Sequence, residues 1–173
     1  LAIEQITIFD VDVNETDDAT IEVTLEVHEG TLDFSADTDV TFKADEEPGG
    51  QTVTFTGSYE EVNATIALLT YSPTAQFNGI DLLTIHALDL NNTGAGGPLS
   101  NTESIIINVV AVNDAPVLTV PTETQLVDED ELLTIDSISV FDQDVSETRG
   151  SVLETTVSVE HGFLNLEETE GIN

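Results

Sequence analysis

Residues 21–34 read IEVTLEVHEGTLDF, and the alternation in this stretch decides the fold class. Apolar side chains occupy every second position from Ile21 to Val27, and acidic or hydroxyl side chains stand between them. A period of two places successive side chains on opposite faces of a β-strand, one face apolar and the other polar. Gly30 then turns the chain into residues 31–34, so the stretch predicts a hairpin-like pair of strands with glycine at the turn.

The same pattern recurs later in the chain. Residues 153–166 read LETTVSVEHGFLNL, and the match extends back without a gap, so that residues 133–166 retrace residues 1–34 at an offset of 132 positions. Fourteen of the 34 aligned positions are identical. Self-similarity at a fixed period indicates structural units in tandem.

The repeat also predicts the domain organisation. We expect a first unit over residues 1–115 and the N-terminal part of the next unit over residues 116–173. The second unit repeats only the opening third of the first. We therefore expect its remainder to lie beyond Asn173, and the first strand of the first unit to lie before Leu1.

The rest of the first unit predicts further strands and one short helix. Ser58 followed by Glu61 has the spacing of a capping box, and apolar side chains recur at helical spacing from Tyr59 to Leu69. Many strands and one helix favour a two-sheet Greek-key β-sandwich, and the absence of cysteine and tryptophan excludes a standard antibody-type domain. The further strands are expected at residues 40–43, 51–56, 82–88 and 104–112.

The charge excludes several classes of partner. The chain has 35 acidic residues against two basic ones, Lys43 and Arg149, and a formal net charge of −33. Nucleic-acid binding needs clustered cations, and anionic membrane surfaces repel a chain of this sign. Because 39% of the residues are hydrophobic and many lie in alternating runs, we predict a packed domain whose carboxylates are solvated or neutralised by cations.

Several kinds of chemistry lack their sequence signatures. The chain has no cysteine for disulfides or thiolate metal sites, and no apolar run long enough to span a membrane. It has no Gly-x-Ser-x-Gly, P-loop or dinucleotide-binding motif, and paired carboxylates carry little information in so acidic a chain. His28, His86 and His161 are scattered, which is typical of surface or packing residues. We therefore expect no enzymatic activity.

The informative constellation is Asp10-x-Asp12 together with its copy Asp142-x-Asp144. Each pair follows an apolar strand and precedes a polar loop. Two carboxylates at i and i+2 can turn their oxygens into one cavity, and calcium prefers cages of six to eight oxygen ligands. The repetition of the pair at matched spacing predicts a calcium site.

An EF-hand is excluded as the form of this site. Counting from Asp10, the sixth loop position is Glu15 where glycine is required. The twelfth position is Ile21 where a bidentate glutamate is required, and the flanking segments are predicted as strands.

A second feature is the stretch Asn113-Asp114-Ala115-Pro116, which follows a long apolar strand. Proline ends strand pairing and fixes an extended direction, so this stretch predicts a junction between units. The order of motifs resembles that of the cadherin-like repeats: Ala87-x-Asp89, the Asn-Asp-Ala-Pro linker, Asp128-Glu129-Asp130 and Asp142-x-Asp144.

The first unit also resembles the tandem repeats of very large secreted or surface-anchored adhesins. The resemblance is carried by Leu69-x-Tyr71-x-Pro73, Phe77-Asn78-Gly79-x-Asp81, Leu83-x-Ile85 and the linker. It implies β-sandwich units strung end to end, calcium at their junctions and an extracellular location. The chain lacks the Leu-Asp-Arg-Glu segment of true cadherins, so no ligand is assigned there.

The resemblance implies three groups of calcium ligands. Asp10, Asp12 and Asp89 would gather at the leading pole of the first unit. Asn113, Asp114, Asp142 and Asp144 would gather at the junction inside the chain, and Glu129 would serve the following junction.

We therefore expect a calcium-stabilised extracellular adhesion or structural module. Its expected partners are neighbouring repeats, other chains that add a strand, or a cell-surface ligand. Two alternatives stay open: a carbohydrate- or other ligand-binding module that uses the loop at residues 91–98, and a metal-independent repeat whose acidity reflects adaptation to high salt. Three sequons, at Asn14, Asn63 and Asn91, are possible glycosylation sites.

Overall fold

The computed structural model describes residues 6–10, 19–90, 97–147 and 149–166. The chain divides into two compact units, which we call unit 1 (Leu1–Ala111) and unit 2 (Val112–Asn173). This division lies slightly before the boundary after residue 115 that the sequence predicted. Each unit is described by itself.

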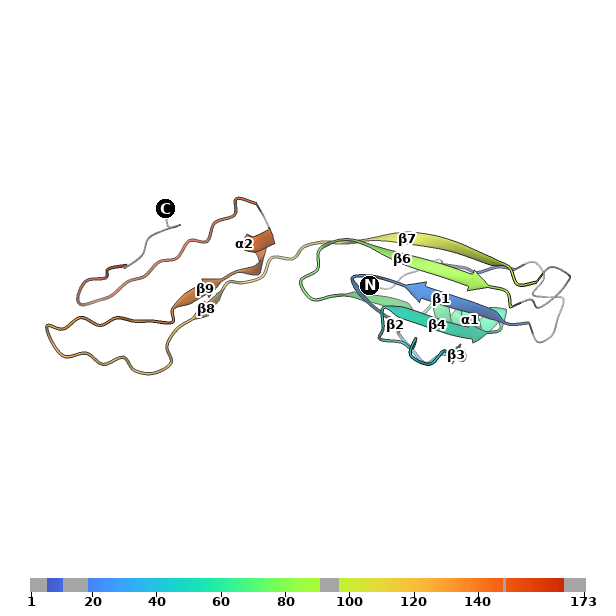
Figure 1. The fold of residues 1–173 in the computed structure, drawn as a ribbon, viewed down its shortest axis with the longest axis horizontal. Helices are drawn as coiled ribbons and strands as arrows, with labels where there is room; N and C mark the ends of the chain where they lie inside the picture. The colour runs from blue at the N-terminus through green and yellow to red at the C-terminus, as the bar shows by residue number, and fades with distance from the viewer. Residues whose placement is uncertain (1–5, 11–18, 91–96, 148, 167–173) are drawn as a thin grey trace. The chain divides into compact units, whose positions relative to one another are not determined.

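Unit 1 is an antiparallel β-sandwich, which confirms the predicted fold class. Its larger sheet has the strand order β3-β4-β1-β6-β7, and its smaller sheet pairs β2 with β5. Figure 1 shows the strands of the larger sheet side by side, with α1 at the end where β4 finishes. The elements are β1 (Ile21–Glu26), β2 (Gly30–Phe34), β3 (Thr41–Phe42), β4 (Thr52–Gly57), α1 (Tyr59–Ile66), β5 (Leu69–Pro73), β6 (Gly79–Leu88) and β7 (Ser100–Val109).

The core of unit 1 follows from the alternation in β1. Val23 and Leu25 are fully buried, while Glu26 on the other face is exposed. β1 lies at the centre of the larger sheet, because Val23 is opposite Phe55 of β4 on one side and opposite Ala87 of β6 on the other. Residues from both sheets and from α1 complete the core: Leu32, Val53, Val62, Ile66, Leu69, Tyr71 and Leu83.

The predicted hairpin between β1 and β2 is wrong. β1 pairs with β4 and β6, whereas β2 pairs with β5, so the chain crosses from one sheet to the other at Gly30. Glycine is needed here for close approach and not for a turn. A Cβ atom added to Gly30 would lie 2.5 Å from Cε2 of Tyr71 and 2.5 Å from the carbonyl oxygen of Ser72.

The predicted helix is present but shorter than its apolar spacing indicated. The Ser58 hydroxyl accepts a hydrogen bond from the Glu61 N–H at 3.3 Å, and the Glu61 carboxylate accepts one from the Ser58 N–H at 2.8 Å. This reciprocal pair is the expected capping box. The helix ends at Ile66, and Leu69 instead begins β5, where it is buried and pairs with Phe34.

No helix in the described part of the chain has the length and apolar character required to cross a membrane.

Unit 2 has one short antiparallel ladder and one short helix among its described residues. β8 (Val117–Thr119) pairs with β9 (Ser139–Phe141), and α2 (Gln143–Glu147), which the sequence did not predict, follows directly. The hairpin expected at residues 155–166 is not formed, because these described residues belong to no strand. In unit 1 the matching residues lie in β1 and β2, which are held by β4, β5 and β6.

Candidate functional site

The strand pairing in unit 2 brings the linker residues next to the second Asp-x-Asp pair. Val117 is opposite Phe141, so the residues before β8 lie beside those that follow β9. The backbone N–H of Asp114 donates a hydrogen bond of 2.7 Å to Oδ2 of Asp144. Two residues that the sequence proposed as ligands of one ion are therefore in direct contact although they lie 30 positions apart.

Asp142 caps the helix that follows it. Its Oδ1 accepts hydrogen bonds from the N–H of Asp144 at 3.0 Å and of Val145 at 3.3 Å. These are the second and third residues of α2, and a carboxylate in this position satisfies N–H groups that lack a partner within the helix. The Asp-x-Asp spacing thus has a local structural role, while the other carboxylate oxygen of Asp142 makes no hydrogen bond within the described residues.

Asn113 completes this group, which we call the linker cluster: Asn113, Asp114, Asp142 and Asp144. The Asn113 side chain donates a hydrogen bond of 3.0 Å from Nδ2 to the carbonyl oxygen of Asp114. Its Oδ1 and the three carboxylates are hard oxygen ligands, the type that calcium prefers. The chemistry of the donor set therefore fits calcium.

The linker cluster is not a preformed metal cage. Within the described ranges, no three His, Asp or Glu side chains are arranged so that they could hold a metal ion. Asp142 and Asp144 are each already engaged with backbone N–H groups. A calcium ion would therefore bind the remaining carboxylate oxygens and take further ligands from backbone carbonyls or water.

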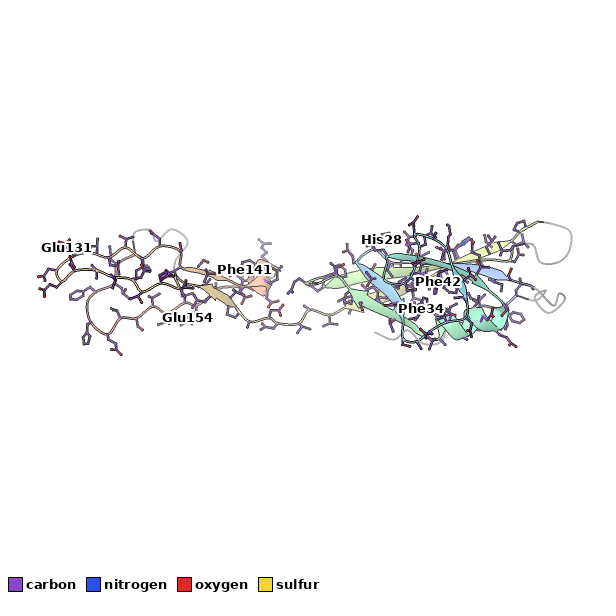
Figure 2. All side chains as sticks on the ribbon, turned by 90° about the horizontal axis from the view of Figure 1, so that it is seen from below. His28, Phe34, Phe42, Glu131, Phe141 and Glu154 are labelled. Atoms are coloured by element: carbon purple, nitrogen blue, oxygen red, sulfur yellow. The ribbon has the colours of Figure 1, made fainter. Side chains whose placement is uncertain are left out.

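Glu129 lies away from the linker cluster. The segment that carries it, residues 120–138, connects β8 to β9 at the end of the ladder opposite to Asp142. Figure 2 shows the neighbouring Glu131 at the tip of this segment, distant from Phe141 of β9. The segment that carries Glu129 therefore lies apart from the linker cluster, and the assignment of Glu129 to a different junction stays a prediction.

Asp89 lies at one end of the larger sheet of unit 1. It directly follows Leu88, which is opposite Glu22 near the start of β1. Its carboxylate accepts a hydrogen bond of 2.9 Å from the N–H of Leu99, and its own N–H donates to the Leu99 carbonyl at 3.0 Å. These contacts close the connection from β6 towards β7.

Asp10 lies at the same end of unit 1. It follows Phe9, whose ring packs edge-on against Tyr59 at a centroid distance of 6.4 Å, and Tyr59 begins α1 just after β4 ends. That end of β4 is beside the start of β1, because Gly57 is opposite Ile21. Asp12, the remaining residue of the proposed group, lies outside the described residues.

Asn63 has a structural role that the sequence did not indicate. Its side chain accepts a hydrogen bond from the Ile8 N–H at 2.9 Å and donates from Nδ2 to the carbonyl oxygens of Ile8 at 3.1 Å and Tyr59 at 2.9 Å. It thereby fixes residues 6–10 against α1. A glycan on Nδ2 would replace one of its two hydrogens and break at least one of the two donated hydrogen bonds, so the fold disfavours glycosylation of Asn63. Asn14 and Asn91 lie outside the described residues.

Among the described residues the most buried carboxylate is that of Asp81, which was not among the predicted site residues. It is only 3% exposed, and its oxygens accept hydrogen bonds from the N–H groups of His28 at 3.1 Å, Glu29 at 3.0 Å and Leu82 at 2.8 Å. The Tyr71 hydroxyl lies 2.9 Å from Oδ2 of Asp81 and equally far from the carbonyl oxygen of Glu29. We call this group the corner network, because it holds the crossing from β1 to β2.

The corner network shifts the pKa values of Asp81 and Tyr71. Burial acts to raise the pKa of Asp81, but the hydrogen bonds from His28, Leu82, Tyr71 and Glu29 outweigh it and keep the pKa below its ordinary value. Burial and the hydrogen bond to Asp81 raise the pKa of Tyr71 to about 12. The Asp81 carboxylate is thus a structural anion with protein partners. In the sequence, Asp81 stood out only as part of the motif Phe77-Asn78-Gly79-x-Asp81, which gave no sign of its burial.

Unit 1 also has an open depression of about 480 Å³. Two half-buried rings, Phe34 and Phe42, lie on its wall, and Figure 2 shows them near each other. Their ring centroids are 5.7 Å apart, and both rings pack against Phe55. The lining residues are Asp33, Phe34, Ser35, Ala36, Asp37, Thr38, Phe42 and Pro48. The loop proposed for ligand binding is a different segment, and its residues 91–96 lie outside the described residues.

Comparison of the chain with models of known protein families, with curated proteins and with solved structures found no match in any of the three. The resemblance to cadherin-like adhesin repeats therefore depends on the sequence motifs alone.

Proposed function

We propose that this chain is a calcium-stabilised extracellular structural module. In this proposal calcium binds the linker cluster and holds residues 113 and 114 against Asp142 and Asp144. The stretch that connects consecutive units thereby becomes stiffer. The result is a chain of β-sandwiches that projects from a surface. The observation that carries the proposal is the contact between Asp114 and Asp144, which joins the linker to the Asp-x-Asp pair within unit 2.

The charge of the chain supports a cationic ligand. Neighbouring carboxylates repel each other by roughly 1 kcal/mol at 4 Å in water, and the net charge of −33 leaves few cations within the chain to offset this. Of the two basic residues, Lys43 is paired with Glu46 in unit 1 at 2.8 Å. That contact raises the pKa of Lys43 and lowers the pKa of Glu46. A divalent ion at the linker cluster would relieve the repulsion between the linker and α2.

The expected affinity is that of other extracellular calcium modules, with a dissociation constant of roughly 10⁻⁴ to 10⁻³ M. Since the proposed site in unit 2 is incomplete without water or backbone ligands, we expect the weaker half of this range. At 10 mM calcium such a site stabilises the bound state by about 1.4 kcal/mol or more. This is comparable to the conformational entropy cost of fixing the backbone of about one residue, roughly 1–2 kcal/mol.

The test is a distance measurement between the two units. The chain contains no cysteine, so the exposed residues Asp37 and Glu154 can be replaced by cysteine and spin-labelled as a unique pair. We expect 10 mM calcium to narrow the distance distribution relative to chelator. The double substitution Asp142→Asn and Asp144→Asn should abolish this narrowing, because it removes both carboxylate charges and leaves the backbone unchanged.

The matched control is Asp136→Asn, which makes the same change at an exposed site of unit 2 away from the linker cluster. It should leave the calcium response intact. A distribution that is equally broad with calcium and chelator would overturn the proposed function. If sodium chloride without calcium narrowed the distance distribution as much as calcium does, the result would instead favour a metal-independent acidic repeat.

A further inference from the structure

Unit 2 exposes apolar side chains at positions where a sandwich should bury them. Along residues 151–166, Val157 is 57% exposed, Val159 is 50% exposed and Leu164 is 53% exposed. Figure 2 shows the nearby Glu154 on this same stretch of unit 2. Exposed apolar side chains that are grouped along one stretch are typical of a surface that a further polypeptide segment can cover.

The internal repeat identifies what covers these positions. Their counterparts 132 residues earlier are Leu25, Val27 and Leu32, which are 0%, 2% and 0% exposed. In unit 1 they are buried because β1 lies between β4 and β6 and β2 pairs with β5. In unit 1 these three side chains are therefore buried by residues 42–109, which follow β2 in the chain.

The surroundings of Gly162 differ from those of its counterpart Gly30. Gly30 is in close contact with the ring of Tyr71, where an added Cβ would lie 2.5 Å from Cε2. At Gly162 an added Cβ would meet no described atom within 4 Å, and the φ of +112° at this residue itself favours glycine. The described residues of unit 2 therefore place no ring beside Gly162.

We propose that residues 153–166 form a receiving surface for a polypeptide segment with the strand and helix pattern of residues 42–109. The segment adds strands on both sides of residues 153–159, packs a helix over them and places a tyrosine beside Gly162. Its aspartate corresponding to Asp81 accepts hydrogen bonds from the N–H groups of Glu160 and His161, the counterparts of His28 and Glu29.

A second copy of this chain is a poorer occupant. Its own residues 42–109 are already packed in unit 1, and its unit 2 offers only the same receiving surface. Bringing two chains of net charge −33 together also adds repulsion. The proposed surface makes no use of calcium, so it stands independently of the proposed function.

The test extends the chain with a second copy of residues 42–111. Residue 166 corresponds to residue 34, so Asn173 corresponds to residue 41 and the copy is attached directly after it. Amide hydrogen exchange of residues 153–166 is then compared with the unextended chain, both in chelator. We expect exchange to slow by at least about 100-fold, because docking converts open backbone into paired strands.

Two adjacent substitutions in the extended chain supply the control. Leu164→Asp should return exchange to its fast rate, because the counterpart Leu32 is fully buried. Asn165→Asp should leave the protection intact, because the counterpart Asp33 is exposed. Equal exchange in the extended and unextended chains would overturn the proposal. Slow exchange in an unextended chain that sediments as a dimer would overturn it as well, since the occupant would then be a second copy.

Discussion

At the scale of single residues, the corner network shows how one carboxylate fixes a fold. Asp81 accepts hydrogen bonds from the N–H groups of His28 and Glu29 in the crossing and from the Tyr71 hydroxyl on β5. It therefore links β1, β2, β5 and β6 at one point. Because the carboxylate is buried, water cannot replace a hydrogen-bond partner that is removed. Each buried donor or acceptor left without a partner costs roughly 1–3 kcal/mol of stability.

The raised pKa of Tyr71 predicts a loss of stability in alkali. Unfolded tyrosine loses its proton near pH 10, whereas folded Tyr71 keeps it to about pH 12. The native state therefore holds a proton that the unfolded state has released, so this stabilisation is complete below pH 10 and disappears as the pH rises towards 12. Urea unfolding of the chain between pH 8 and 12 measures it. Tyr71→Phe should flatten the decline, and Tyr59→Phe should not; equal slopes in all three would contradict the assignment.

At the scale of elements, the sequence predicted those features of strands and helices that depend only on neighbouring residues. The alternation in β1 and the capping box of α1 are properties of adjacent residues, and both are confirmed. The pairing of β2 with β5 could not be predicted, because a two-residue period does not say which strand lies alongside. Leu69 was assigned to the helix because one apolar position fits a helical and a strand pattern equally well.

Gly30→Ala tests the packing at the crossing. The added methyl would collide with the Tyr71 ring and with the rigid backbone oxygen of Ser72. We expect a loss of about 1–3 kcal/mol in the free energy of unfolding, measured by urea titration of the chain. Thr31→Ala, on the exposed neighbouring residue of the same strand, should change stability by less than about 0.5 kcal/mol. A Gly30→Ala loss no larger than this would mean that the glycine is not required for close approach.

At the scale of the whole molecule, the repeat at 132 positions predicted tandem units and the second Asp-x-Asp pair, and the resemblance to cadherin-like repeats implied the grouping of the linker cluster. The sequence motifs named Asn113, Asp114, Asp142 and Asp144 together, and the structure places them in hydrogen-bonded contact. The sequence did not reveal that Asp142 caps a helix, because α2 has only five residues and little periodic pattern. The corner network escaped prediction since burial of a single aspartate depends on its tertiary neighbours.

Calcium titration of the linker cluster, followed through backbone amide chemical shifts, tests the central claim most directly. The Asp114 N–H is the best reporter, because it donates to Asp144. At constant ionic strength we predict that Asp114, Asp144 and Val145 shift along one saturation curve with a midpoint of roughly 1 mM or below. The substitutions Asp142→Asn and Asp144→Asn should eliminate this curve. Amide shifts that do not saturate, or that are identical in the substituted chain, would contradict calcium binding at the linker cluster.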